Sequence, residues 1–149
     1  TNLSIRISKR QFKSLSMLAK LAYRNFTRSE FACKCGKCDS TGMEISDELL
    51  DALQALRTIC EFPFFITSGY RCPAHPVEQK KDTVGAHALG LAVDIAVNRE
   101  EAIHLLRNAL NCNVFTGIGV NQKGGGRFIH LDIATEDDIN APRPNIWSY

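Results

Sequence analysis

The sequence contains no long apolar run. None of its hydrophobic stretches reaches the roughly 18 residues that a membrane-spanning helix needs, which argues against an integral membrane protein. It also lacks an excess of charge of one sign, since 18 Lys and Arg residues face 16 Asp and Glu residues. A net charge of +2 offers little to neutralise a phosphate backbone, so the sequence does not favour nucleic-acid binding.

The first residues lack the pattern of a secretory signal peptide. The stretch TNLSIRISKRQF carries cationic side chains but no apolar block followed by a small-residue cleavage site. Further along, Lys and Arg residues alternate with leucines at spacings of three and four. This pattern predicts a basic amphipathic helix within residues 1–25, solvated and packed on the domain, with contact to a membrane surface or an anionic polymer as the alternative.

The chain is long enough for one hydrophobic core but not for two. Its 149 residues can bury roughly 70% of the surface of the unfolded chain around a single core. Six cysteines are too few for disulfides alone to define the fold, so a core must still stabilise it. We therefore expect one domain over residues 26–149, preceded by the basic segment of residues 1–25.

Hydrophobic periodicity predicts an α+β domain with a small, mainly antiparallel sheet flanked by helices. Helices are expected at residues 46–60 and 99–110, the second with a buried stripe of Ile103, Leu106 and Leu110. Strands are expected at residues 62–68, 91–97, 114–120 and 127–133, the last two joined by a turn of three glycines. The tail from residue 137 carries two prolines and should run as an extended cover, anchored by Trp147.

Two of these strands carry ionisable side chains on the face opposite their large apolar residues. Asp94 lies between two alanines on the small-residue face of the strand at 91–97. His130 and Asp132 share the corresponding face of the strand at 127–133. Burying such groups without partners is costly, so this face either meets solvent or binds a ligand.

A third candidate, His87, precedes the strand that carries Asp94. Gly90 lets the backbone turn sharply between the two residues, so that Asp94 projects back toward His87. Imidazole nitrogen and carboxylate oxygen are ligands that zinc accepts, and three protein ligands leave a fourth position for water. His87, Asp94 and His130 are therefore a candidate set of ligands for a catalytic Zn²⁺.

The same residues carry a resemblance to a known family. The run from His87 to Asp94 matches the H-x-x-G-x-A-x-D motif of the zinc-dependent D-alanyl-D-alanine carboxypeptidases and dipeptidases, which cleave peptidoglycan. The segments SGYRCPAH at 68–75 and FIHLDI at 128–133 also resemble that family. RPNIWSY at 143–149 resembles the closing segment of a phage and bacterial, endolysin-like branch. The likeness covers about residues 26–149.

The resemblance implies a zinc fold similar to that of the hedgehog signalling domain. It implies a metallopeptidase that hydrolyses amide bonds of peptidoglycan stem peptides, as a D-alanyl-D-alanine carboxypeptidase or an endolysin-type endopeptidase. Arg71 would bind the substrate carboxylate through two parallel hydrogen bonds, with Ser68 and Tyr70 as neighbouring substrate-binding residues. The enzyme would act as a monomer on the bacterial cell envelope, encoded by a cell or by a phage.

The chain departs from the family pattern at two positions. Gly85 replaces the usual Ser two residues before the first His, and Arg127 occupies the position where many members carry the catalytic carboxylate. Asp132, two residues after His130 on the same strand face, is the substitute general base that we predict. In the alternative interpretation, Asp132 holds the ligand His130 in place. At the level of function, the alternative is a non-catalytic, zinc-stabilised domain that recognises cell-wall or protein ligands.

The cysteines leave several states open. Cys33, Cys35 and Cys38 lie within six positions, and Cys72 follows Arg71 directly. Disulfides that join the two segments are favoured if the protein works outside the cytoplasm, and a structural zinc held by four thiolates is the alternative. A nucleic-acid module built on the same cysteines is disfavoured by the charge balance and by the lack of nearby aromatic residues. The two remaining cysteines are expected to act as small apolar residues.

Overall fold

The computed structural model describes residues 8, 10 and 25–149, so the helix predicted within residues 1–25 lies largely outside the described part. The elements in chain order are η1 (Arg28–Phe31), α2 (Asp47–Cys60), β1 (Phe65–Ser68), η2 (Glu78–Lys80), η3 (Ala86–Leu89), β2 (Ala92–Ala96), α3 (Arg99–Cys112), β3 (Gly117–Asn121), β4 (Phe128–Asp132), α4 (Glu136–Ile139) and β5 (Asn145–Ser148). Among the described residues, no helix has the length and apolar character needed to cross a bilayer.

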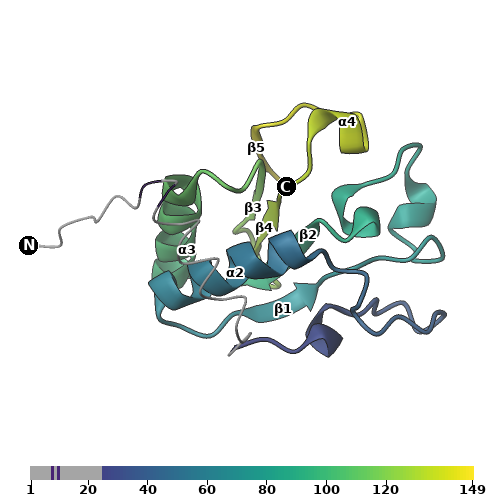
Figure 1. Cartoon of the computed structure of the whole chain (residues 1–149), viewed down its shortest axis with the longest axis horizontal. Helices are drawn as coiled ribbons and strands as arrows, with labels where there is room; N and C mark the ends of the chain where they lie inside the picture. Colours follow the sequence, from purple (N-terminus) through teal and green to yellow (C-terminus); the bar gives the residue numbers. More distant parts are fainter. Residues whose placement is uncertain (1–7, 9, 11–24) are drawn as a thin grey trace, which may run out of the picture.

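The strands form one five-stranded sheet in the order β1-β2-β4-β3-β5. Pairing is antiparallel throughout, except that β5 pairs with β3 in parallel. Figure 1 shows α2 lying across this sheet with α3 beside it. This architecture confirms the predicted α+β class with a mainly antiparallel sheet and flanking helices. It also shows that the extended tail is a paired strand and not only a cover.

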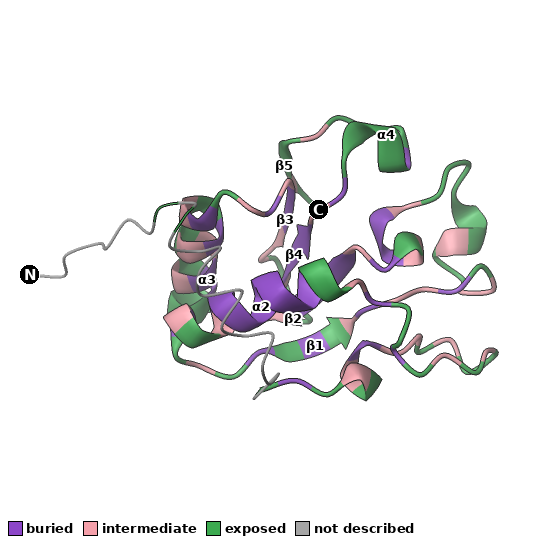
Figure 2. Cartoon of the chain, in the orientation of Figure 1, coloured by how far each residue is buried: buried purple, intermediate pink, exposed green. Residues whose placement is uncertain are grey.

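Helix α2 follows its sequence pattern closely. The Ser46 hydroxyl caps its first turn by accepting a hydrogen bond from the Leu49 amide at 3.0 Å. Leu49, Leu53 and Leu56 are fully buried, and Figure 2 shows most of the helix in the colour of buried residues. The predicted stripe is therefore the face that packs into the core.

The predicted face of α3 is wrong at two of its three residues, and only Leu106 packs, partly buried, against the main core. Ile103 and Leu110 are 60% and 50% exposed, while Leu105 is fully buried. The buried face consists of Ala102, Leu105, Ala109 and Cys112. These four residues also follow the helical period, but three of them are small, so the pattern of large apolar side chains favours the neighbouring stripe.

The sheet has one apolar face and one face that carries ionisable side chains. Val93, Ile95 and Leu131 are fully buried in the main core, together with residues of α2 and α3. Asp94, His130 and Asp132 project from the other face, as the alternation of the strands predicts. A second, small apolar cluster, formed by Ala86, Ala92, Ala134 and Ile139, packs on that side.

One transverse row of residues crosses the whole sheet. Ser68 pairs with Asp94, Asp94 with His130, His130 with Gly119, and Gly119 with Trp147. Directly opposed residues on neighbouring strands have side chains that point to the same face. The row therefore brings residues from five strands together on the face that carries Asp94 and His130.

Candidate metal centre

Three predicted ligands meet at one point. Oδ1 of Asp94 lies 3.0 Å from Nδ1 of His130 and 3.2 Å from Nε2 of His87, and the two nitrogens are 3.2 Å apart. All three residues are buried, with exposed fractions of 4–6%. The structure thus brings together the predicted ligand set of His87, Asp94 and His130.

Backbone geometry places His87 in this group. Gly90 ends η3 in the left-handed region, with a φ of 70°, and a Cβ atom there would lie 2.0 Å from the carbonyl oxygen of Glu44. Only glycine fits that position without displacing the backbone. The Gly90 carbonyl also accepts a hydrogen bond from the Ser46 amide at 3.0 Å, which ties this turn to the start of α2.

The hydrogen-bond partners of the outer nitrogen in each imidazole fix the tautomer of that ring. Nδ1 of His87 lies 2.7 Å from the carbonyl oxygen of Gly69, which can only accept a hydrogen bond, so Nδ1 carries the proton. Nε2 of His130 lies 2.9 Å from Oδ2 of Asp132 and carries the proton for the same reason. In the neutral rings, the two inner nitrogens, Nε2 of His87 and Nδ1 of His130, therefore carry the lone pairs.

This donor set fits a metal ion. Two imidazole lone pairs and a carboxylate oxygen face one another inside a buried space, and a single cation satisfies all three. Ligands of tetrahedral zinc at their usual distances are about 3.3 Å apart, close to the 3.0–3.2 Å found here. Burial raises the pKa of Asp94, but hydrogen bonds with His130 and His87 outweigh it and lower that pKa well below its usual range.

Asp132 lies behind His130, away from the metal-facing nitrogen. It is fully buried, and its two oxygens are held by the Arg143 guanidinium at 3.0 and 2.8 Å. Burial raises the pKa of Asp132, but hydrogen bonds from His130 and Arg143 lower it below its usual value. The role of Asp132 as the general base stays a prediction. The geometry favours the alternative, in which its carboxylate orients His130.

Arg143 and the tail around it are the part of the site that sequence reasoning missed. The Arg143 guanidinium lies 5.0 Å from the centre of the Trp147 ring, which is itself 5.1 Å from the His130 ring. Trp147 packs flat on β3, where a Cβ atom at Gly119 would approach its ring to 2.7 Å. The sequence predicted Trp147 only as an anchor of the tail, and the likeness of segment 143–149 to the family assigned Arg143 no role.

Arg71 lies directly beside the three ligands. One guanidinium nitrogen is 2.9 Å from Oδ2 of Asp94, the oxygen that the histidines leave free, and Nε donates to the Ser68 hydroxyl at 2.9 Å. A third nitrogen lies 3.8 Å from the Glu78 carboxylate. Two of the three predicted substrate-binding residues, Arg71 and Ser68, therefore border the candidate metal centre.

Tyr70 is the predicted site residue that lies elsewhere. Its side chain packs partly buried against the main core. Burial raises the pKa of its hydroxyl, and nearby Glu44 and the thiol of Cys72 add to the increase. Substrate binding by Tyr70 stays a prediction.

Comparison with known proteins supports the same conclusion as the geometry. Residues 24–132 match the model of the family Peptidase M15. The matched region includes all three candidate ligands, together with Arg71 and Asp132. A search of curated proteins gave no match. The match spans well over half of the chain, so this protein belongs to the Peptidase M15 family and is a zinc-dependent peptidase, with His87, Asp94 and His130 as its candidate zinc ligands.

Proposed function

We propose that this peptidase hydrolyses amide bonds in bacterial peptidoglycan stem peptides, at a bond close to a substrate carboxylate. The observation that carries the proposal is the 2.9 Å contact between Arg71 and the second oxygen of Asp94. A carboxylate held by this guanidinium would lie next to the metal centre, with its neighbouring amide bond within reach. The enzyme would then work at the cell envelope. Family membership favours this activity over the non-catalytic binding domain that the sequence left open.

The guanidinium of Arg71 has capacity for a further anion. Its side chain keeps 15% of its surface exposed, and its contact with Glu78 is a loose ion pair at 3.8 Å. Glu78 is also paired with Lys81 at 2.8 Å, so it has a second cation as a partner. An incoming carboxylate can therefore form strong, charge-assisted hydrogen bonds with Arg71 without leaving Glu78 unpaired.

The other residues position the reacting groups. Bound zinc supplies Lewis acidity toward an amide carbonyl and toward water. His87 and His130 keep their metal-facing nitrogens unprotonated, because Gly69 and Asp132 hold the single proton of each ring on the opposite nitrogen. Asp94 joins this arrangement to substrate binding, since one of its oxygens faces the histidines and the other faces Arg71.

Carboxylate recognition can be tested by a double-perturbation cycle, in which the enzyme and the substrate are altered separately and together. Peptides ending in D-alanyl-D-alanine are compared with their carboxyl-terminal amides, on the unaltered enzyme and on Arg71→Lys. Either change alone should lower kcat/KM at least tenfold, about 1.4 kcal/mol, and the second change should then add little. Fully additive losses would show that Arg71 does not bind the substrate carboxylate.

Purified peptidoglycan tests the substrate class. Zinc-loaded enzyme should release new amino groups from it, and His87→Ala should not. Free D-alanine among the products indicates a carboxypeptidase, whereas cleaved cross-bridges without free D-alanine indicate an endopeptidase. Hydrolysis of unrelated peptides but of no peptidoglycan substrate would contradict the proposal.

A further inference from the structure

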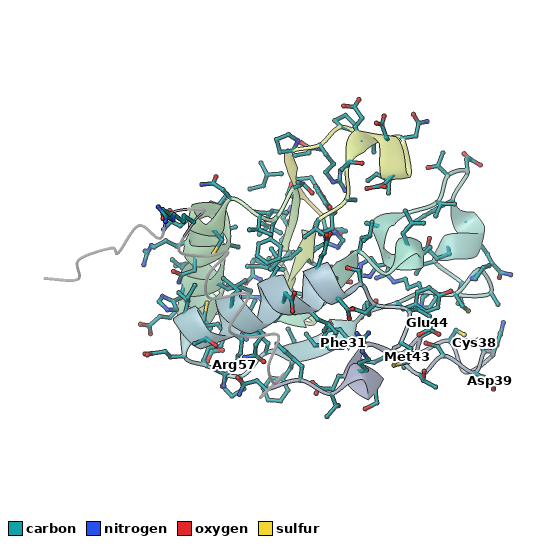
Figure 3. The ribbon with its side chains drawn as sticks, in the orientation of Figure 1. Phe31, Cys38, Asp39, Met43, Glu44 and Arg57 are labelled. Atoms are coloured by element: carbon teal, nitrogen blue, oxygen red, sulfur yellow. The ribbon has the colours of Figure 1, made fainter. Side chains whose placement is uncertain are left out.

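Four cysteines outside the peptidase site converge on one point. Cys33, Cys35 and Cys38 come from the loop after η1, and Cys72 comes from the loop after β1. Their sulfur atoms all lie within 4.8 Å of one another. Figure 3 shows Cys38 in a loop at the far end of the molecule from Arg57 of α2.

The spacing of the sulfurs is that of a shared metal ion. Cys35 Sγ lies 3.6 Å from Cys38 Sγ and 3.5 Å from Cys72 Sγ. Four thiolates around tetrahedral zinc are about 3.8 Å apart, whereas a disulfide requires about 2.0 Å. Cys35 is almost equally close to two partners, so the cluster has no preferred pair. All six cysteines, which are all described, are unbonded, and the disulfides favoured by the sequence are not formed.

The backbone of the loop is arranged to support thiolates. Gly36 adopts a φ of 70°, which glycine tolerates best, and the chain bends from Cys35 to Cys38. Within this bend, the Lys37 amide donates to Cys35 Sγ at 3.3 Å. The Cys72 amide donates to Cys33 Sγ, also at 3.3 Å. Hydrogen bonds from outside the ligand set orient metal ligands and stabilise their charge.

We propose that Cys33, Cys35, Cys38 and Cys72 bind a second metal ion, zinc, in a closed four-thiolate site. Four protein ligands complete a tetrahedral shell and leave no open position, so this ion is structural and takes no part in hydrolysis. Within the C-x-C-x-x-C run, Cys35 and Cys38 have the two-residue separation of paired zinc ligands. The fourth ligand comes from a segment more than thirty residues further along the chain.

The second ion would join two loops that the peptidase site depends on. Cys72 is adjacent to Arg71, whose guanidinium contacts Asp94. Nearby, the Tyr70 amide donates to the carbonyl of Phe31, the last residue of η1, at 2.8 Å. A metal bond to Cys72 would restrict the backbone that carries Arg71. This consequence rests on the proposed role of Arg71 in substrate binding, whereas the metal site itself does not.

Metal content tests the site independently of any activity. Protein purified with reductant and zinc, then freed of excess metal, should contain two zinc ions per chain. Cys35→Ala and Cys38→Ala should each retain one, and His87→Ala should lose the other. Cys60→Ala and Cys112→Ala are matched controls, because both cysteines are buried in the main core, and these variants should retain two.

Cobalt substitution tests the site on the unaltered protein, where failure to fold is no concern. Cobalt bound by four thiolates gives an intense sulfur-to-metal charge-transfer absorption, which histidine and carboxylate ligands do not give. We expect that absorption in the unaltered protein and in His87→Ala. Its absence, one zinc per chain, or disulfides among the four cysteines in the reduced and zinc-loaded protein would each overturn the proposal.

Steady-state kinetics test the effect on Arg71. Cys35→Ala should raise KM at least tenfold for a peptide with a free carboxylate and change KM little for the matching amide, with kcat less affected. Equal losses for the two peptides would show that the cysteine site does not position Arg71. A negative kinetic result would not alter the measured metal content. The existence of the second metal site and its effect on Arg71 can therefore be tested separately.

Discussion

At the scale of single residues, Asp94 joins two functions through one carboxylate. Oδ1 faces His87 and His130, and Oδ2 faces Arg71. An Asn in its place would present one oxygen and one N–H group, so it could satisfy only one of the two sides. The position therefore requires two acceptor atoms on a side chain of this length.

The role of Asp132 can be settled by replacing it with Asn. If its carboxylate only orients His130, Asp132→Asn should weaken zinc binding about 10- to 100-fold, and activity should largely recover at saturating zinc. Zinc affinity from competition with a chelator, measured alongside kcat, checks this expectation. Unchanged zinc affinity with abolished kcat at saturating zinc would instead support the general-base interpretation.

Arg143 should act through Asp132 and not on the substrate. Arg143→Met removes the two hydrogen bonds that Arg143 donates to the carboxylate and leaves it buried with fewer partners. We expect the variant to bind zinc less tightly, with a similar relative loss of kcat/KM for acid and amide peptides. A selective loss for the acid peptide would show that Arg143 contacts the substrate carboxylate.

At the scale of elements, the two faces of α3 make a direct stability test. Leu105→Ala should lower the free energy of unfolding by about 2–5 kcal/mol, because Leu105 is fully buried. Ile103→Ala, two residues earlier on the same helix, should change it by no more than about 0.5 kcal/mol. Denaturant unfolding of both variants measures the difference. Equal losses would contradict the orientation of α3 described above.

The contact between β3 and Trp147 gives a second test. A Cβ atom at Gly119 would lie 2.7 Å from the indole ring, so Gly119→Ala should displace the ring and destabilise the protein by about 1–3 kcal/mol. Trp147 is the sole tryptophan of the chain, and its fluorescence reports the displacement. The control is Gly125→Ala, where a Cβ atom has open space, and neither stability nor fluorescence should change.

Elements with one dominant pattern could be predicted from the sequence, and those with competing patterns could not. The stripe of α2 and the alternation around Asp94 and His130 each had one interpretation, and the structure confirms both. Helix α3 carries two stripes of similar period, so its buried face depends on packing against α2. The parallel pairing of β5 with β3 joins distant segments, and nothing local encodes it.

At the scale of the whole molecule, the peptidase metal lies on the face of the sheet opposite the main core. In Cys35→Ala, which would hold the peptidase ion alone, chelation should therefore abolish hydrolysis while leaving the secondary structure in place, because the main core does not involve the ligands. Restored zinc at a thousandfold excess over its Kd should add about 4 kcal/mol of stability. Activity, circular dichroism and thermal unfolding before and after chelation check both statements. Loss of all structure on chelation would contradict the separation of core and site.

The candidate ligands could be predicted because they are close in sequence or share a strand motif. Arg143 could not, since its contact with Asp132 arises only when the tail folds back along β3. The cysteine cluster was left open for the same reason. Its fourth member becomes a neighbour only through the path of the loop after β1.

The transverse row from Ser68 to Trp147 makes zinc binding depend on the register of the strands, because two of the ligands lie on neighbouring strands. A slip of one residue between β2 and β4 would turn Asp94 or His130 to the opposite face of the sheet. Misaligned chains would then lack a complete set of ligands, and zinc would bind only those that had aligned correctly. Metal added during refolding should thus favour correctly aligned molecules, so the catalytic ion would also stabilise the native strand register over misaligned ones.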